Sequence, residues 1–331
     1  MRWGLIGASN IAASHMIGAM RATGGDVVSV LSSSPERAAD YAKEHGIAKG
    51  HSDLDALLGG DIDAVYISST NEKHFPQAMA AIAAGKHVLC EKPLAMSVAD
   101  AVTMVRAADK AGLVFATNHH LRNAGSHIAI RDLIASGRIG EILSARVMHA
   151  VYLPPHLQGW RIDNPEAGGG VIPDIVVHDA DTVRFHLGED PAEVVAIQTS
   201  AGMGEGVEDS VMSVWQMQSG ATVMTHESFT HRFAGTGIEV HGTKGSIRAT
   251  GVMTQRPTGH VTLITDAGEE DVPFADHNLY QRSVGLFTDA VAGKGAPSAD
   301  GIDGIKSLAV ASAVAKAATS GARVAVDYGG V

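Results

Sequence analysis

The chain has 331 residues, 45% of them hydrophobic and 18% charged, which predicts a packed protein of two domains and not a disordered chain. Acidic residues outnumber basic ones by 36 to 25, and the net charge of −11 argues against nucleic acid or an anionic membrane as a partner. The only cysteine, Cys90, excludes an internal disulfide. We expect a cytoplasmic protein, because no apolar run approaches the ~20 residues of a membrane span and the N-terminus is typical of a strand, not a signal peptide.

The first third of the chain alternates short apolar runs with helical stretches. The pattern predicts strands at 2–6, 27–31, 64–68, 87–90 and 113–117, and helices at 11–22, 35–45, 74–84 and 97–112. Strands that are apolar throughout and alternate with helices indicate an α/β domain with a doubly wound parallel sheet, the Rossmann architecture. The pattern changes near 118–122, so we expect one domain over 1–119 and a second over 120–331.

The second domain has a different pattern of elements. It predicts helices at 126–136, 172–187, 279–291 and 305–318, a long strand at 142–153, and strands joined by glycine turns from 193 to about 274. Short strands joined by tight turns favour antiparallel pairing. We therefore expect an α+β domain with a large, mostly antiparallel sheet.

A glycine-containing loop joins the first strand to the first helix. Gly7 occupies the first position of the dinucleotide fingerprint, Ser9 replaces the second glycine, and Ala12 fills the third position. Gly7 permits the tight turn, and the helix that follows presents its N-terminus to a phosphate. A plain tight turn is the alternative, but the position at the first strand of a strand–helix repeat favours a dinucleotide site.

The end of the second strand indicates which dinucleotide is bound. NAD enzymes place an acidic residue there to bind the ribose 2′-hydroxyl, whereas this chain has Ser32 and Ser33, followed by Arg37. Hydroxyls and a guanidinium suit a 2′-phosphate, which favours NADP(H). Alternatively, Arg37 is an ordinary surface charge.

Two further segments carry residues suited to catalysis. Lys92 follows a predicted buried strand at the sheet edge where α/β proteins bind ligands, and a lysine there can polarise a carbonyl. Asp174 and His178 are four residues apart on a predicted helix, with Asp181 near the same side, so a carboxylate can orient an imidazole proton donor. Alternatively, Asp174 complements the helix dipole and His178 is incidental. At most one of the adjacent His119 and His120 is expected to face a site, and no metal site is expected.

Four segments together resemble the glucose-fructose oxidoreductase and inositol dehydrogenase family (Gfo/Idh/MocA). They are GLIGASNIA at 4–12, STNEKH at 69–74, AGKHVLCEKPLA at 84–95 and GGGVIPDIVVHDAD at 168–181. The resemblance implies that Lys92, Asp174 and His178 are catalytic and that the site lies between the two domains. It also implies a cis peptide between Lys92 and Pro93, and an open sheet in the second domain that offers a surface for a homo-oligomer.

A closer likeness to a bacterial NADPH-dependent reductase of this family is carried by SSSPER, TNHHLRNA, HAVYLPPHLQGWR and SAGMGEGVED. Asn10 and Ser69 stand where threonine is expected, and both keep a polar group. The likeness implies cofactor contacts from Gly7, Ala8, Ser9, Asn10, Ile11, Ser32, Ser33, Arg37, Ser69, Thr70, Asn71, His74, Glu91, Lys92, Asn118, Trp160, Arg161 and Tyr280.

Together, these features predict an enzyme that reduces a ketone on a small sugar-like substrate with NADPH. Another sugar or inositol dehydrogenase of the same family is an alternative. A glycosidase that keeps NAD bound is a second, although the predicted NADP site argues against it. A non-catalytic nucleotide sensor is a third, but such proteins usually lose the lysine or the histidine that this chain retains.

Overall fold

The structure is a computed structural model that describes residues 1–200 and 202–331, and it forms two compact units. Unit 1 consists of residues 1–119, 280–305 and 331, and unit 2 consists of residues 120–279 and 306–330. The predicted division into domains of 1–119 and 120–331 stays a prediction; by its contacts, the segment 280–305 packs with the first 119 residues.

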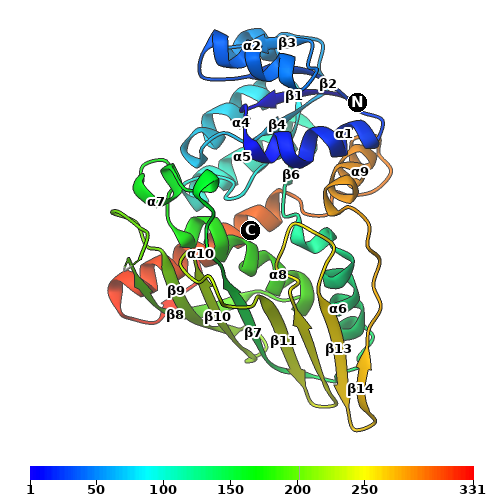
Figure 1. The fold of residues 1–331 in the computed structure, drawn as a ribbon, viewed down its shortest axis with the longest axis vertical. Coiled ribbons are helices and arrows are strands. Elements are labelled where there is room, and N and C mark those ends of the chain that lie inside the picture. Colours follow the sequence, from blue (N-terminus) through cyan, green and yellow to red (C-terminus); the bar gives the residue numbers. More distant parts are fainter. Residues whose placement is uncertain (201) are drawn as a thin grey trace. The chain divides into compact units, whose positions relative to one another are not determined.

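A six-stranded sheet forms the centre of unit 1, with strand order β3-β2-β1-β4-β5-β6 (Figure 1). Every neighbouring pair is parallel, which confirms the predicted doubly wound sheet. The sequence pattern missed β3, because this strand is short and largely exposed. The strands are β1 (Arg2–Ile6), β2 (Asp26–Leu31), β3 (Lys49–His51), β4 (Ala64–Ile67), β5 (His87–Cys90) and β6 (Phe115–Thr117).

Helix α5 of unit 1 (Val98–Ala111) begins and ends at residues suited to its two ends. Ser97 accepts a hydrogen bond from the Asp100 N–H at the start of α5, and Gly112 ends that helix with a φ of 66°. The first helix opens with a π-helical turn, η1, which the sequence pattern did not predict. The elements are η1 (Ala12–Met16), α1 (Ile17–Ala22), α2 (Pro35–Glu44), α3 (Leu54–Leu58), η2 (Asn71–Lys73), α4 (His74–Ala83), α5 (Val98–Ala111) and α9 (Leu279–Val291).

Unit 2 is built on a nine-stranded sheet with strand order β14-β13-β12-β11-β7-β10-β9-β8-β15. The sheet is mostly antiparallel, as predicted, although the central strands β7 and β10 run parallel. The predicted strand at 142–153 ends at residue 150. The strands are β7 (Ile142–Ala150), β8 (Pro191–Thr199), β9 (Ser210–Met217), β10 (Thr222–Ser228), β11 (Gly237–Gly242), β12 (Ser246–Thr250), β13 (His260–Thr265), β14 (Gly268–Asp271) and β15 (Val324–Ala325).

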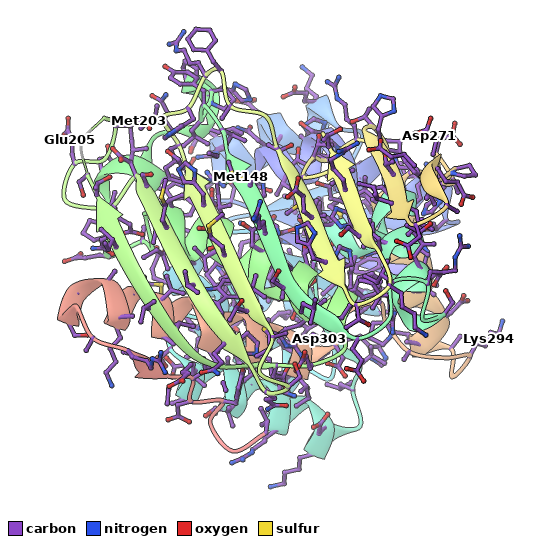
Figure 2. All side chains as sticks on the ribbon, turned by 90° about the horizontal axis from the view of Figure 1, so that it is seen from below. Met148, Met203, Glu205, Asp271, Lys294 and Asp303 are labelled. Atoms are coloured by element: carbon purple, nitrogen blue, oxygen red, sulfur yellow. The ribbon has the colours of Figure 1, made fainter. Side chains whose placement is uncertain are left out.

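Helices cover one face of this sheet and leave the other open (Figure 1). The alternation of buried and exposed residues along β9 separates the two faces: Trp215 is fully buried, whereas Met212 is 56% exposed. Figure 2 looks onto the open face, where Met148 of β7 is labelled. The helical elements are η3 (Leu121–Asn123), α6 (Gly125–Ala135), η4 (Pro155–Leu157), α7 (Trp160–Asp163), the π-helical η5 (Ile172–Val176), α8 (Val177–Leu187) and α10 (Gly301–Ser320).

Candidate active site

The glycine loop after β1 has the geometry expected of a dinucleotide-binding turn. Gly7 has a φ of +119°, and a Cβ atom there would lie 2.8 Å from the Ser69 nitrogen. Only glycine fits this position without strain. The Ser9 hydroxyl lies 2.7 Å from the Ser68 hydroxyl and accepts a hydrogen bond of 3.2 Å from the Ala12 N–H. The serine that replaces the second glycine therefore secures the start of the first helix.

Helix α2 holds this loop from the side of β2. The Arg37 guanidinium donates to the Ala8 carbonyl at 3.1 Å, and the Tyr41 hydroxyl donates to the Ser9 carbonyl at 2.9 Å. Burial raises the pKa of Tyr41 to about 12, so this hydroxyl keeps its proton. Ser32 and Ser33 follow the last residue of β2. The loop therefore has a guanidinium beside it and no carboxylate at the strand end.

The carboxyl end of β5 carries a network of polar side chains around Glu91. Its Oε1 atom accepts hydrogen bonds from the Tyr66 hydroxyl at 2.5 Å and from the Asn118 amide at 2.6 Å. The Ser283 hydroxyl donates to the other end of the Asn118 amide at 3.2 Å. Burial raises the pKa of Glu91, against the effect of these hydrogen bonds. The network fixes the backbone from which the next residue, Lys92, extends.

The peptide between Lys92 and Pro93 is cis, as the family resemblance implied. His74 connects this segment to the loop after β4: its Nδ1 atom lies 2.8 Å from the Pro93 carbonyl, and its Nε2 atom lies 3.2 Å from the Ser69 carbonyl. His74 is fully buried, and burial lowers its pKa. Its side chain therefore joins two loops, and the expected cofactor contact of His74 stays a prediction.

The remaining expected cofactor residues of unit 1 lie near the same edge of the sheet. Tyr280 stacks on His15 with ring centroids 4.5 Å apart and is almost fully buried. Burial and the nearby Glu91 raise its pKa well above the ordinary value. Thr70 donates to Glu72 at 2.7 Å. Three others are placed at the start of the first helix and of η2: Asn10, Ile11 and Asn71.

Unit 2 holds the glycine-rich segment that precedes the expected catalytic helix. A Cβ atom on Gly169 would lie 2.5 Å from the Trp160 carbonyl, so this residue must be small for α7 to pack against it. The guanidinium of Arg161 lies 4.6 Å from the centre of the Trp160 ring. Glu208 accepts a hydrogen bond of 2.9 Å from the Ile172 N–H, and burial raises the pKa of this carboxyl. These contacts fix where the helical segment begins.

Asp174 and His178 lie on two consecutive helical elements and not on one α-helix. The segment begins as the π-helical η5 and continues as α8, a difference from the predicted helix at 172–187. Pro173 near its start has no N–H to donate, and single π-helical turns are frequent at functional sites. Asp174 pairs with Arg161 at 3.4 Å. The His178 ring contacts the His120 ring edge-to-face, with centroids 4.8 Å apart.

Asp181, which was expected near the same side as His178, forms a buried ion pair. Arg122 donates to it through Nε at 2.9 Å and through Nη2. The Arg122 guanidinium also lies 5.2 Å from the centre of the Phe185 ring. Asp181 therefore holds η3 against α8 and fixes the position of His120.

Lys92 belongs to unit 1, whereas Asp174 and His178 belong to unit 2. That these three side chains meet at one substrate oxygen stays a prediction, as do the cofactor contacts of Trp160 and Arg161. Among the described residues, no group of three acidic, histidine or cysteine side chains could hold a metal ion.

Sequence reasoning missed several polar side chains near His178. His149 pairs with Asp179 at 2.7 Å, and Asp179 raises the pKa of the buried Glu227. One feature of the sequence pointed to them: apolar and polar residues alternate along β7 and β10, and this alternation places His149 and Glu227 on the covered face of the sheet. The sequence does not reveal that β7 and β10 are neighbours, so this signal could not be joined to α8.

The fold and the site together define an oxidoreductase with a dinucleotide-binding domain. Residues 1–119 match the oxidoreductase family with an NAD-binding Rossmann fold, and residues 127–248 match the GFO/IDH/MocA C-terminal domain. The chain belongs to the Gfo/Idh/MocA family and uses a nicotinamide cofactor.

Relatives of the chain extend over its full length. It is 59% identical to a 1,5-anhydro-D-fructose reductase of Ensifer adhaerens, with 99% of both chains covered. It is 28% identical to a D-xylose 1-dehydrogenase (NADP(+)) of Haloferax volcanii, with 99% of this chain and 100% of the relative covered. A solved levoglucosan dehydrogenase, in complex with NADH and L-sorbose, superposes with a TM-score of 0.89 at 24% identity over 99% of both chains. At that identity the superposition supports the fold alone.

Proposed function

We propose that the protein reduces the C2 ketone of 1,5-anhydro-D-fructose with NADPH and forms 1,5-anhydro-D-mannitol. The observation that carries this proposal is the 59% identity, over 99% of both chains, to a 1,5-anhydro-D-fructose reductase. The contacts of unit 1 agree with a dinucleotide, and those of unit 2 agree with a proton donor in a polar setting.

The preference for NADPH rests on Arg37 and on the two serines after β2. The guanidinium already lies against the glycine loop, where it contacts Ala8. A 2′-phosphate in this position would form charge-assisted hydrogen bonds with Arg37 and accept others from Ser32 and Ser33. No carboxylate stands at the strand end to bind the 2′-hydroxyl of NADH.

When bound, NADPH supplies the hydride that adds to the ketone carbon. Lys92 would place a cation beside the carbonyl oxygen and stabilise the negative charge that develops there. His178 would donate the proton that completes the alcohol. Asp174 would favour the charged imidazole, and its ion pair with Arg161 holds the carboxylate in place. Either Lys92 or His178 can make the final proton transfer.

We also propose that the open face of the nine-stranded sheet joins two copies of the chain. Large apolar side chains are exposed there, including Ile197 at 76% and Met212 at 56%. Met148, which is 37% exposed, is labelled on this face in Figure 2. Exposed apolar surface of this kind is typical of interfaces. Light scattering should give the mass of a dimer or a larger assembly, and Ile197→Asp should reduce it. A monomeric wild-type chain would contradict this part of the proposal.

No helix among the described residues is long and apolar enough to cross a membrane. The expected cytoplasmic location stays a prediction.

The test of the proposed activity is a substrate panel with the wild-type enzyme. NADPH consumption is followed with 1,5-anhydro-D-fructose, D-fructose, D-xylose and an inositol ketone, each also with NADH, and the product is identified by chromatography. The proposal predicts the highest kcat/KM for 1,5-anhydro-D-fructose with NADPH. A higher value for one of the other sugars would assign a different substrate and overturn it.

A further inference from the structure

A line of hydrogen bonds crosses the covered face of the sheet in unit 2. The Trp215 indole donates to the Ser213 hydroxyl at 2.7 Å, and the Ser213 hydroxyl lies 2.7 Å from that of Thr225. Thr225 in turn donates to Glu227 Oε2 at 3.1 Å. Because the Thr225 hydroxyl donates its proton to Glu227, it accepts a hydrogen bond from Ser213. Trp215, Ser213 and Thr225 therefore each donate to the next residue of the line, which ends at Glu227.

Glu227 meets a second buried carboxyl, that of Asp179. Both residues are fully buried, and none of the other residues in 1–200 and 202–331 gives a hydrogen bond to Glu227 Oε1 or Asp179 Oδ2. Two neighbouring carboxylates cannot both be ionised in such a place. Burial and the adjacent Asp179 raise the pKa of Glu227 well above its ordinary value. One proton held between the two carboxyls satisfies both orphan oxygens.

The other oxygen of Asp179 holds an imidazole. His149 Nδ1 lies 2.7 Å from Asp179 Oδ1, and His149 is the register partner of Glu227 across the parallel strands β7 and β10. The ring of His149 lies with its centroid 6.5 Å from that of His178. His178 is therefore flanked by His149 and, through the edge-to-face contact, by His120.

We propose that His149 is a positioning residue for the proton donor His178, and that Asp179 and the protonated Glu227 fix its ring and its charge environment. The inference rests on the acid role given to His178 in the proposed function. Asp179 accepts one hydrogen bond from the Glu227 hydroxyl and one from His149 Nδ1–H, which fixes the tautomer of His149. The pair Asp179–Glu227 carries one negative charge, which favours a protonated imidazole nearby.

Other titratable groups lie near the cluster formed by His149, Asp179 and Glu227, and their charges also act on His178. Asp174 is paired with Arg161, and Asp181 is paired with Arg122, which weakens the effect of either carboxylate on an imidazole. His127 and His186 contact each other at 3.1 Å, and burial lowers the pKa of both, so they stay neutral. The single charge shared by Asp179 and Glu227 therefore adds to the effect of Asp174 on His178.

The first test is the pH profile of kcat for variants of the cluster. Asp179→Asn removes the carboxylate, and His149→Gln removes the imidazole that lies between this carboxylate and His178. Each variant should move the alkaline limb to lower pH by about one unit, because the protonated form of His178 is then less favoured. Glu227→Ala should shift the limb as well. Glu227→Gln should recover the wild-type profile, because its amide N–H replaces the carboxyl O–H. His87→Gln is the control, since His87 is a histidine at the start of β5 in unit 1, at the other end of that strand from Lys92.

Two results of this test would overturn the proposal. Wild-type profiles for both Asp179→Asn and His149→Gln would show that the cluster is only structural. A shift with Glu227→Gln as large as that with Asp179→Asn would show that Glu227 carries the charge and that no proton is shared.

The second test needs no substrate and remains valid if the aspartate variant does not fold. A carboxyl with a raised pKa in the folded state binds an extra proton on folding, so its contribution to stability is lost as the pH rises above the ordinary carboxyl range. Glutamine does not titrate. The Tm of Glu227→Gln minus that of the wild type should therefore increase between pH 5 and 8. A difference that is independent of pH would overturn the shared proton. An increase accompanied by no turnover of any ketone would overturn the proposed function alone.

Discussion

Different kinds of contact stabilise two regions of the molecule: the cofactor edge of unit 1, which is the glycine loop with its neighbours Arg37 and Tyr41, and the region around α8 in unit 2. Around the glycine loop, most contacts involve the backbone: Gly7 must be small, and Arg37 and Tyr41 donate to carbonyls. Around α8, side chains from distant strands meet, as when His149 binds Asp179. Backbone-determined sites leave a compact motif in the sequence, whereas side-chain networks depend on which strands are neighbours.

The largest expected effect tests whether unit 1 contributes to chemistry as well as to binding. Lys92→Ala should lower kcat by on the order of 10²–10⁴, because the developing charge on the carbonyl oxygen loses its cation. Lys110→Ala is the control, since Lys110 is exposed near the end of α5. Steady-state kinetics beside NADPH titration separate the two roles. A kcat equal to that of the wild type would limit unit 1 to cofactor binding.

The next largest effect tests how much a buried ion pair of unit 2 contributes to the free energy of unfolding. Asp181→Asn leaves the buried Arg122 guanidinium without its carboxylate and should lower the free energy of unfolding by about 3–5 kcal/mol. Glu193→Gln removes the partner of the exposed Arg323 and should cost less than about 1 kcal/mol. Urea unfolding of both variants measures the difference. Equal losses would show that the buried pair is no stronger a tie than a surface pair.

The smallest expected effect tests whether Arg37 contacts the 2′-phosphate of NADPH. Arg37→Ala should raise KM for NADPH roughly ten- to hundredfold, as expected for one hydrogen bond to a charged group, and leave KM for NADH nearly unchanged. Arg106→Ala on α5 is an exposed control. Steady-state kinetics with each cofactor decide the point. Equal losses with both cofactors would show that Arg37 supports the loop and does not contact the 2′-phosphate.

The same contrast explains what could be predicted from the sequence. The strands and helices of unit 1 were predicted to within a few residues, because apolar runs, Ser97 and Gly112 mark their ends. The strand β3 and the helix α3 were missed, because each is short. The parallel pairing of β7 with β10 was missed as well, since strands far apart in the chain give no local signal.

The residues of the candidate site likewise fall into two groups, those that a sequence motif reveals and those that it does not. Gly7, Lys92, Asp174 and His178 stand in motifs that a single sequence displays. The partners of α8 do not: His149 and Glu227 are ordinary strand residues until the register of β7 and β10 places them opposite each other. The π-helical turns η1 and η5 were likewise not predicted, because the apolar spacing of a π-helical turn differs little from that of an α-helix.

The central claim is that unit 1 holds the cofactor and that α8 of unit 2 supplies the proton. The most direct measurement is the kcat of His178→Ala with 1,5-anhydro-D-fructose across pH 6–8, together with its Kd for NADPH. The account predicts a loss in kcat on the order of 10²–10⁴ with an unchanged Kd. A variant that keeps the wild-type kcat over this range would contradict it.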